Sequence, residues 1–245
     1  MTRLTDSPNE VETLKRKNLR ATYRTCYKSA SFLKFLTAPD CYFIENSWEQ
    51  LKGDQYSSTT VRVNRQLIKH RSVVAKRYNK KNAWHALRRT VRRSRAENCW
   101  NHAIDLEALG INIPSPVAFI QEYASFGLKS CSWYLYEFVD GLSCIEELKN
   151  NNITNNDEVM GKIVATLGAL WKQNISHGDT KGTNFLLAHD QVVIIDLDSI
   201  KQHKNDRGAR RLIQKDVSRF LRNWQDNPHL LKMARTKLKL LGINP

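Results

Sequence analysis

Three polar side chains that lie close together in the sequence could carry out phosphoryl transfer. Asp179 stands in a His-Gly-Asp sequence, Asn184 follows five residues later, and Asp196 ends a run of four β-branched apolar residues. Phosphoryl transfer needs a carboxylate that accepts the proton of a hydroxyl nucleophile, and an amide and a second carboxylate that hold Mg²⁺ against the ATP phosphates. The residue types and their order therefore indicate a catalytic loop within residues 175–199.

A surface hairpin is the alternative interpretation of this stretch. In that case Asp179 and Asn184 would be turn residues, and Asp196 would only end a strand. The apolar run 192–195 predicts a buried strand, which would fix the Asp196 carboxylate at its end. The same order of aspartate, asparagine and second aspartate occurs in the catalytic loop and metal site of protein kinases, so the surrounding elements must decide.

A nucleotide would be held by elements upstream of this stretch. Residues 51–63 predict two strands joined by a turn at Gly53, and backbone N–H groups at such a tip can approach phosphates. An ordinary hairpin is the alternative, because the segment holds a single glycine. Lys76 follows a short apolar strand, which is the setting of the kinase lysine that pairs with the α- and β-phosphates.

The helical pattern over 82–109 would supply the partner of this lysine. Protein kinases pair it with a helix glutamate, for which Glu97 is best placed and Glu107 is the alternative. A later strand runs into a turn, where the backbone of Glu137 and Val139 could meet the adenine ring. An ordinary core strand would have the same sequence pattern.

Apolar stripes downstream predict three helices. One stripe over 160–171 would deliver the chain to the catalytic loop, and a second belongs to a helix whose first turns hold Asp216. A last helix is expected at about 229–241. We expect the polar residues 149–156 and the basic residues 201–211 to form loops.

The composition limits the partners of the chain. Its 245 residues, 41% of them apolar, suffice for one domain of ordinary size or for two lobes that share a cleft. The net charge of +15 predicts attraction to nucleic acid, an acidic lipid surface or a phosphorylated substrate, without choosing among them. Five cysteines, with no Cys-x-x-Cys pair, predict free thiols. We expect neither a secretory signal nor a membrane-spanning helix, because no apolar run is long enough.

Residues 1–40 are expected to form a basic extension. Cationic residues are dense between positions 15 and 34, with tyrosine and phenylalanine among them or just after. This combination is typical of a segment on a membrane surface. The alternative is a solvated extension packed loosely on the domain, because the apolar residues form no long stripe.

These parts stand in the order found in the lipopolysaccharide core kinases, a branch of the protein-kinase-like superfamily, which the chain resembles over about residues 40–225. The most specific matches are His-Gly-Asp-Thr-Lys-Gly-Thr-Asn at 177–184 and Ile-Asp-Leu-Asp at 195–198. Softer matches fall in the same order as in the family: the sequence around Lys76, Ser94-Arg95-Ala96 with Trp100, Gly110-Ile111 before two prolines, and 136–141.

The resemblance implies an α+β, two-lobed protein-kinase-like fold. A small β-rich N-lobe would occupy residues 41–139 and a mainly helical C-lobe residues 140–245. By the same resemblance, Lys76 holds the α- and β-phosphates of ATP, Asp179 accepts the proton of a sugar hydroxyl, and Lys181 neutralises the γ-phosphoryl group.

The metal and the support of the loop are implied in the same way. Asn184 and Asp196 would bind Mg²⁺, and Asp216 would brace the catalytic loop from its helix. The glycine-rich loop of protein kinases is reduced here to Gly53 with serines and threonines. Only twenty residues lead from Asp196 to Asp216 and no Ala-Pro-Glu follows, so a protein substrate is disfavoured.

The resemblance further implies ATP-dependent phosphorylation of a heptose or Kdo sugar in the inner core of a lipopolysaccharide precursor. The protein would then be cytoplasmic and peripheral on the anionic inner face of the bacterial inner membrane. A soluble small molecule such as an aminosugar is the alternative acceptor. We do not expect a non-catalytic nucleic-acid-binding protein, because Lys76, Asp179, Asn184 and Asp196 are all present.

Overall fold

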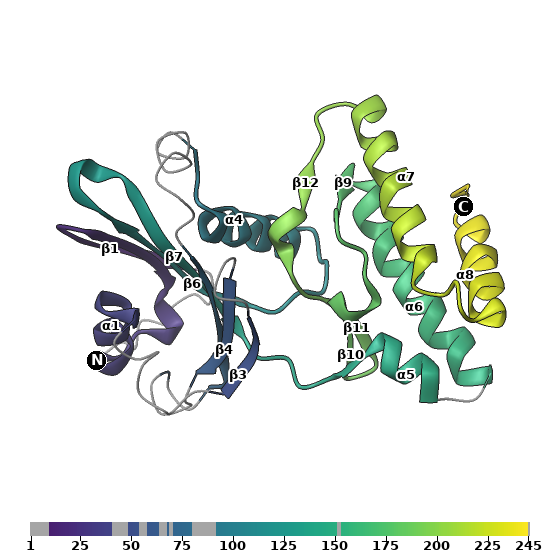
Figure 1. Ribbon diagram of the computed structural model, residues 1–245, viewed down its shortest axis with the longest axis horizontal. Coiled ribbons are helices and arrows are strands. Elements are labelled where there is room, and N and C mark those ends of the chain that lie inside the picture. The colour runs from purple at the N-terminus through teal and green to yellow at the C-terminus, as the bar shows by residue number, and fades with distance from the viewer. Residues whose placement is uncertain are drawn as a thin grey trace, which may run out of the picture. The chain divides into compact units, whose positions relative to one another are not determined.

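The chain forms two compact units, one rich in strands and one mainly helical (Figure 1). The first comprises Met1–Ile104 with Ser115–Phe138, and the second comprises Asp105–Pro114 with Val139–Pro245. The predicted α+β class is confirmed. The computed structural model describes residues 10–40, 49–53, 58–63, 68, 71–79, 92–150 and 153–244.

The first unit is built on a seven-stranded antiparallel sheet in the order β1-β2-β6-β7-β5-β4-β3. The strands are β1 Val11–Arg16, β2 Leu19–Arg24, β3 Glu49–Gly53, β4 Ser58–Val63, β5 Val73–Tyr78, β6 Pro116–Tyr123 and β7 Lys129–Glu137. The pairing of β3 with β4 and the strand before Lys76 confirm what the sequence predicted there. The central strands β6 and β7 are rich in β-branched and aromatic residues, which suit a sheet buried on both faces.

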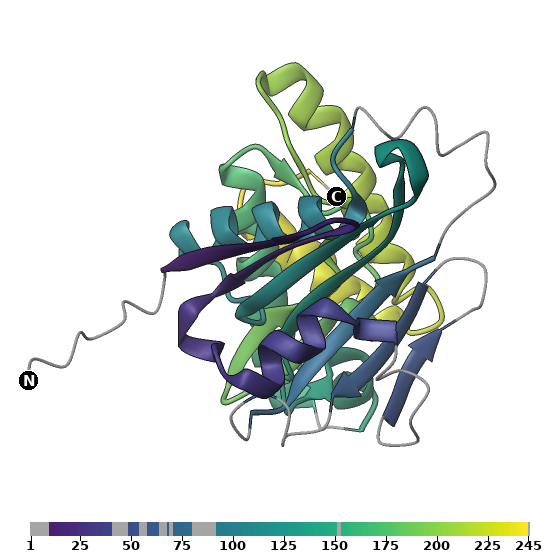
Figure 2. The same cartoon turned by 90° about the vertical axis from the view of Figure 1, so that its left-hand side faces the viewer.

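The two faces of this sheet carry different side chains. Along β5, Ala75 joins the apolar core that includes helix α1 (Ala30–Thr37), whereas Tyr78 contacts helix α4 (Arg95–Ala108). Figure 2 shows α1 lying across the strands, on the face of the sheet to which Ala75 contributes. On the other face Trp100 of α4 packs against Phe119 of β6, with ring centroids 5.9 Å apart. Lys76 lies two residues before Tyr78 and therefore shares the α4 face.

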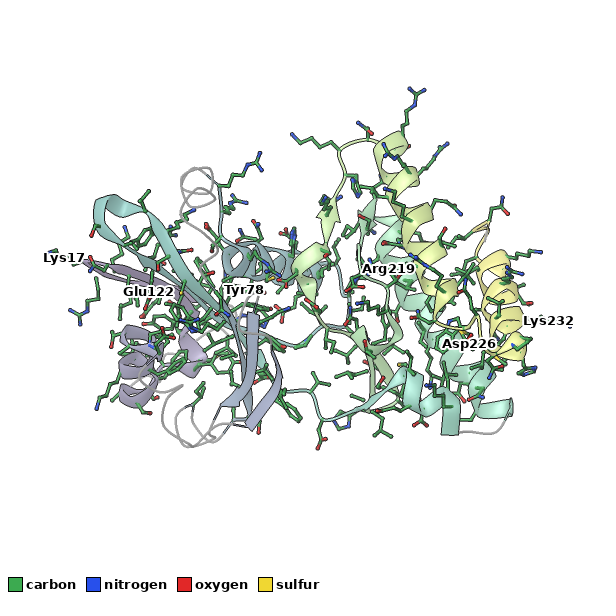
Figure 3. The ribbon with its side chains drawn as sticks, viewed as in Figure 1. Lys17, Tyr78, Glu122, Arg219, Asp226 and Lys232 are labelled. Carbon is green, nitrogen blue, oxygen red and sulfur yellow. The ribbon has the colours of Figure 1, made fainter. Side chains whose placement is uncertain are left out.

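The N-terminal segment 11–37 belongs to this sheet and its core, so the expected separate extension over residues 1–40 is wrong for it. β1 and β2 form a hairpin, and β2 pairs with β6. Tyr23 and Phe32 are buried in the same core as Trp133, and they are not available to a membrane interface. Lys17, labelled in Figure 3, is exposed at the hairpin tip. The sequence does not reveal that these aromatic residues are buried, because they are distributed over a short strand, a single turn and a two-turn helix. No one element carries a continuous apolar stripe.

The second unit contains helices and two small antiparallel sheets. Its strands β8, β10 and β11 form one sheet, and β9 and β12 form the other. α6 packs on α8, and α7 lies beside β9 (Figure 1). The elements are β8 Leu142–Ser143, α5 Cys144–Asn150, α6 Ile153–Lys172, β9 Ile175–Ser176, β10 Phe185–Ala188, β11 Gln191–Ile194, β12 Lys201–Gln202, α7 Asp206–Arg222 and α8 Pro228–Leu240.

The helices confirm the predicted stripes but begin earlier than predicted. The apolar residues of the 160–171 stripe are all buried on α6. Asn205 accepts a hydrogen bond from the backbone N–H of Gly208 and so caps α7, which turns residues 206–211 from a predicted loop into helix. The predicted loop 149–156 likewise holds the end of α5 and the start of α6.

Two further predictions concern thiols and the membrane. Cys26, Cys99, Cys131 and Cys144 are free thiols, as predicted, and Cys41 lies outside the described residues. Within the described ranges, no helix combines the length and the hydropathy that crossing a bilayer would require.

Candidate active site

The two candidate metal ligands lie at the open end of one hairpin. β10 and β11 pair along their length, and beyond their ends the Ile195 N–H donates to the Asn184 carbonyl at 2.9 Å. Asn184 therefore lies opposite Ile195, the residue directly before Asp196, although Asn184 and Asp196 are twelve positions apart in the sequence. The turn of the hairpin is at residues 189–190, where both φ angles are positive. Asn184 itself ends a short 3-10 turn, Gly182–Asn184, directly before β10, so it does not form the turn of this hairpin.

One buried carboxylate holds the backbone of the catalytic loop. Asp216 of α7 accepts hydrogen bonds from the N–H groups of His177 and Gly178, at 2.7 and 2.8 Å, and from Trp171 Nε1 at 3.3 Å. The Thr180 hydroxyl donates to the Asp216 carbonyl at 2.7 Å. Hydrogen bonds to a buried carboxylate are short and strong because the acceptor is charged. The predicted bracing role of Asp216 is confirmed.

The far end of the loop is held by Asn223, which directly follows α7. Its Oδ1 accepts from the Gly182 N–H at 3.1 Å, and its Nδ2 donates to the Thr180 carbonyl at 2.9 Å. A Cβ on Gly182 would lie 2.3 Å from Ile145 Cγ1. Gly178 has φ +78°, and a Cβ there would lie 2.7 Å from a backbone oxygen. Both glycines are required for the loop to lie this close to its neighbours.

The carboxylate of Asp179 lies beside two cations. Its side chain is 23% exposed; Arg219 Nε lies 3.1 Å from Oδ1 and Lys181 Nζ lies 4.0 Å from Oδ2. The Arg219 N–H is not directed at Oδ1, and among the described residues none donates a hydrogen bond to that buried oxygen. Arg219 Nη1 donates instead to the Gly178 carbonyl at 3.2 Å. Arg219 is thus held between the Asp179 carboxylate and the backbone of the loop.

The His177 imidazole supports the loop as a neutral group. Its Nδ1 accepts from the Asp179 N–H at 3.2 Å, and its ring lies 5.9 Å from that of Phe185. Burial lowers the pKa of His177 below its ordinary value of 6.5, although the charges of Asp216, Asp196 and Asp179 favour the protonated ring. Only the neutral ring can accept at Nδ1, so burial and the hydrogen bond select the same form.

The open end of the hairpin offers the donor atoms that Mg²⁺ prefers. Asn184 Nδ2 donates to the Asp179 carbonyl at 2.9 Å, which turns Oδ1 of that amide to the other side. Asp196 has φ 63° and ψ 74°, a left-handed conformation that non-glycine residues adopt rarely. Mg²⁺ often takes only one or two protein ligands and completes its shell with phosphates and water.

In the parts of the chain that the structure describes, no group of three or more His, Cys, Asp or Glu side chains could hold a metal ion. Asn184 and Asp196 therefore fit an ion shared with phosphate groups.

Lys76 lies in the first unit, on the face of the sheet that contacts α4. Its Nζ is 5.6 Å from the centre of the Tyr78 ring, and the Tyr78 hydroxyl lies 3.3 Å from Cys99 Sγ. Arg95 of the same helix lies over that ring, at 4.6 Å. α4 thus presents Cys99 and Arg95 to Tyr78, whereas Glu97 lies about 160° around the helix from Cys99. The pairing of Lys76 with Glu97 stays a prediction.

The other predicted nucleotide contacts lie at strand ends. Gly53 ends β3 and pairs with Thr59, and the turn between them lies outside the described residues. The carboxylate of Glu137, at the end of β7, accepts from Arg71 Nη1 at 2.5 Å. A contact between Glu137 and adenine would therefore use its backbone. Val139 begins the second-unit segment after this strand.

Arg219 and Asn223 hold the loop but were not predicted from the sequence. Arg219 is one of many basic residues, and an asparagine after a helix is a common end residue. Their spacing from Asp216 could have identified them, because positions i, i+3 and i+7 lie on one face of a helix. Asp216 and Arg219 lie on the face of α7 that braces the loop, and Asn223 continues that face as the residue that ends the helix.

Comparisons with known proteins identify the family and the fold of the chain. Residues 46–237 match the sequence profile of the lipopolysaccharide kinase (Kdo/WaaP) family. Among solved structures, the chain is similar to the one titled "WaaP in complex with acyl carrier protein", with a TM-score of 0.52 and 15% sequence identity. That likeness covers 86% of this chain and 97% of the other, and it shows a protein-kinase-like fold. The comparison with curated protein sequences gives no match.

Proposed function

The chain belongs to the lipopolysaccharide kinase (Kdo/WaaP) family, and we propose that it transfers the γ-phosphoryl group of ATP to a heptose or Kdo hydroxyl of the lipopolysaccharide inner core. The surroundings of Asp179 support this proposal most. Its carboxylate lies between Arg219 and Lys181, on a loop whose backbone is anchored by Asp216. Phosphoryl transfer depends on such positioning and charge placement more than on covalent chemistry by the protein.

In the proposed reaction, Asp179 accepts the proton of the attacking sugar hydroxyl. The hydroxyl oxygen bonds to the γ-phosphorus while the bond from that phosphorus to the β–γ bridging oxygen breaks, and ADP leaves. The proton passes to the Asp179 carboxylate, whose buried Oδ1 lies 3.1 Å from Arg219 Nε. Lys181 and Arg219 stabilise the charge on the transferred group.

The other predicted residues would bind the nucleotide. Asn184 and Asp196 would hold Mg²⁺, which neutralises charge on the β- and γ-phosphates when it is bound. Lys76 would contact the α- and β-phosphates, with Glu97 as its predicted partner and the Gly53 turn covering the phosphates. The backbone of Glu137 and Val139 would meet the adenine.

We also propose that the acceptor is part of a membrane-attached precursor and that the protein works at the cytoplasmic face of the inner membrane. The net charge of +15 supports this location, because each basic residue near an anionic surface contributes about 1 kcal/mol of attraction. A free aminosugar is the alternative acceptor.

The test is transfer of radioactive γ-phosphate from ATP to purified inner-core lipopolysaccharide, with kanamycin as the aminosugar comparison. Asp179→Asn should reduce transfer about a thousandfold without changing the midpoint of thermal unfolding. Asp226→Asn, at an exposed position labelled in Figure 3, is the matched control. Undiminished transfer by Asp179→Asn would show that Asp179 is not the base. Transfer to kanamycin but not to lipopolysaccharide would reject the proposed acceptor.

A further inference from the structure

A cavity of about 660 Å³ adjoins the catalytic loop within the second unit. Strands β9 and β12, with Gly178 after β9 and Asp198 and Ser199 before β12, form one side, and α7 forms the other. Its lining includes Gly178, Asp216 and Arg219, which lie next to Asp179 in sequence or hold its loop. A molecule in this cavity would therefore lie next to Arg219, whose Nε is 3.1 Å from the carboxylate of the proposed base.

The lining of this cavity is basic and rich in hydroxyl groups. Four cationic side chains face two carboxylates, and one of these, Asp216, is already bound to the loop backbone. The cationic residues are Lys201, Lys215, Arg219 and Arg222, the second carboxylate is Asp198, and the hydroxyls come from Ser176, Ser199 and Ser218. Ser218 donates to the Gln214 carbonyl and Ser176 bonds His203 Nε2, so the guanidinium and ammonium groups are the main donors. They suit a phosphate or a carboxylate.

The basic lining continues along α7 as a stripe. The stripe comprises Arg207, Arg211, Lys215, Arg219 and Arg222, at spacings of four, four, four and three residues, which places them on one face of the helix. It extends along about 22 Å of helix, more than one sugar ring occupies. Arg219 is half-buried at the loop, and the other four are exposed.

Like charges three or four residues apart destabilise a helix. The same number of basic residues spread around α7 would give the same net charge without this cost, so solubility alone does not explain the stripe. The opposite face of α7 is buried through Val217 and Phe220, which fixes the direction in which the stripe points. A flat membrane surface would meet the exposed arginines but would not enter the cavity next to Asp179. A flexible anionic chain could contact both.

We propose that the cavity and the α7 stripe form the acceptor subsite for an anionic oligosaccharide. One phosphate or carboxylate group binds in the cavity through Lys215 and Arg222, close to the hydroxyl that Asp179 deprotonates. Further anionic groups of the same saccharide bind along Arg211 and Arg207. This inference rests on the proposed function, whose acceptor it specifies as a saccharide with at least two anionic groups.

The first experiment measures transfer kinetics for single α7 variants with inner-core lipopolysaccharide as acceptor. Arg222→Gln should raise the acceptor KM about tenfold, because a charge-assisted hydrogen bond is lost. Arg211→Gln, at an exposed site, should raise it about threefold. The KM for ATP should be unchanged in both. Arg210→Gln is the matched control, because Arg210 is exposed and lies about 100° around the helix from Arg211.

The second experiment measures binding without ATP, by calorimetry, with deacylated core oligosaccharide. Three forms of this probe are compared: native, enzymatically dephosphorylated and carboxyl-reduced. If the dephosphorylated oligosaccharide binds more weakly than the native one, the cavity binds a phosphate group. If the carboxyl-reduced oligosaccharide binds more weakly, the cavity binds a carboxylate. Equal affinity for all three forms, or equal affinity of Arg222→Gln and wild type, would overturn the inference.

These two experiments separate the inference from the proposed function. If oligosaccharide binding depends on Arg222 but the wild type transfers no phosphate, the subsite is supported and the proposed kinase function is rejected. Transfer with no dependence on the stripe would keep the function and reject the subsite. A third arm uses vesicles of phosphatidylcholine with 30% phosphatidylglycerol. If stripe variants lose vesicle binding while oligosaccharide binding is unchanged, the stripe is a membrane contact and the inference is rejected.

Discussion

The catalytic loop at 177–184 and the N-terminal segment at 11–37 are both polar in sequence, yet they are held in opposite ways. Backbone hydrogen bonds to one buried carboxylate, Asp216, fix the loop. Burial of aromatic side chains such as Tyr23 and Phe32 fixes the segment. The anchoring charge of the loop lies inside the protein, whereas the charged side chains of the segment, apart from the buried Arg24, are exposed or half-buried.

This difference determines what each region tolerates. A buried polar group is stable only while its hydrogen bonds are made, so a change of one atom in Asp216 should disturb the loop. Apolar burial is spread over many contacts, so the segment should tolerate changes to its surface charges but not removal of its core residues. The following predictions test this contrast.

Removal of residues 1–40 should have the largest effect. The deletion takes away two strands of the seven-stranded sheet and helix α1, together with Phe32 and Phe35 of the core. Loss of a single buried phenylalanine costs about 3–5 kcal/mol, so losing both with two strands should leave no folded first unit. Circular dichroism and urea unfolding of the deletion measure this. A deletion as stable as the full chain would mean that the segment is an extension after all.

Asp216→Asn should have the next largest effect. The substitution keeps the shape but turns an amide N–H toward a backbone donor, so the free energy of unfolding should fall by about 3 kcal/mol. Transfer should fall at least about a hundredfold, because the loop is no longer fixed. Urea unfolding and transfer assays are the measurements. Equal values for Asp216→Asn and the exposed control Asp226→Asn would contradict the anchoring role.

Asn223→Ala should loosen only the far end of the loop. It removes the acceptor for Gly182 and the donor to Thr180, so we expect a loss of about 1–2 kcal/mol and a moderate fall in kcat. Asn227→Ala removes the side chain that caps α8. It should lower the free energy of unfolding by a similar amount without changing kcat. If both variants change kcat equally, Asn223 acts through overall stability.

Tyr23→Phe should change how the first unit responds to alkaline pH. Burial, with the hydrogen bond to Glu12 at 2.6 Å, raises the pKa of Tyr23 from 10.0 to about 12. Because the pKa is higher in the folded state, the stabilisation is complete below pH 10 and is lost as the pH rises toward 12. Unfolding measured between pH 9 and 12 should depend less on pH in the variant. Tyr123→Phe is the control, and an unchanged pH dependence in Tyr23→Phe would contradict the prediction.

Lys17→Ala should have the smallest effect. Lys17 is exposed at the tip of the β1–β2 hairpin (Figure 3), and surface changes of this kind usually alter stability by less than about 0.5 kcal/mol. Thermal unfolding measures this directly. A loss comparable to that of Asp216→Asn would show that the outward charges also hold the segment.

The candidate site could be predicted from the sequence where its residues are close together. Asp179, Asn184 and Asp196 fall within twenty residues, and the strand before Asp196 has a clear apolar pattern. The N-terminal strands could not be predicted in the same way. Their alternation is short, and pairing of β2 with β6 joins residues about one hundred positions apart, which no local pattern reveals.

By itself, the sequence determined the residue types that can transfer a phosphoryl group and the order in which they stand. These follow from chemistry, because only certain side chains accept protons or bind Mg²⁺. The tertiary structure alone decided that Arg219 and Asn223 meet the loop, that a basic cavity adjoins the loop at Gly178 and that the N-terminal strands complete the sheet. Such contacts depend on the packing of distant elements, and packing is decided by the whole chain at once.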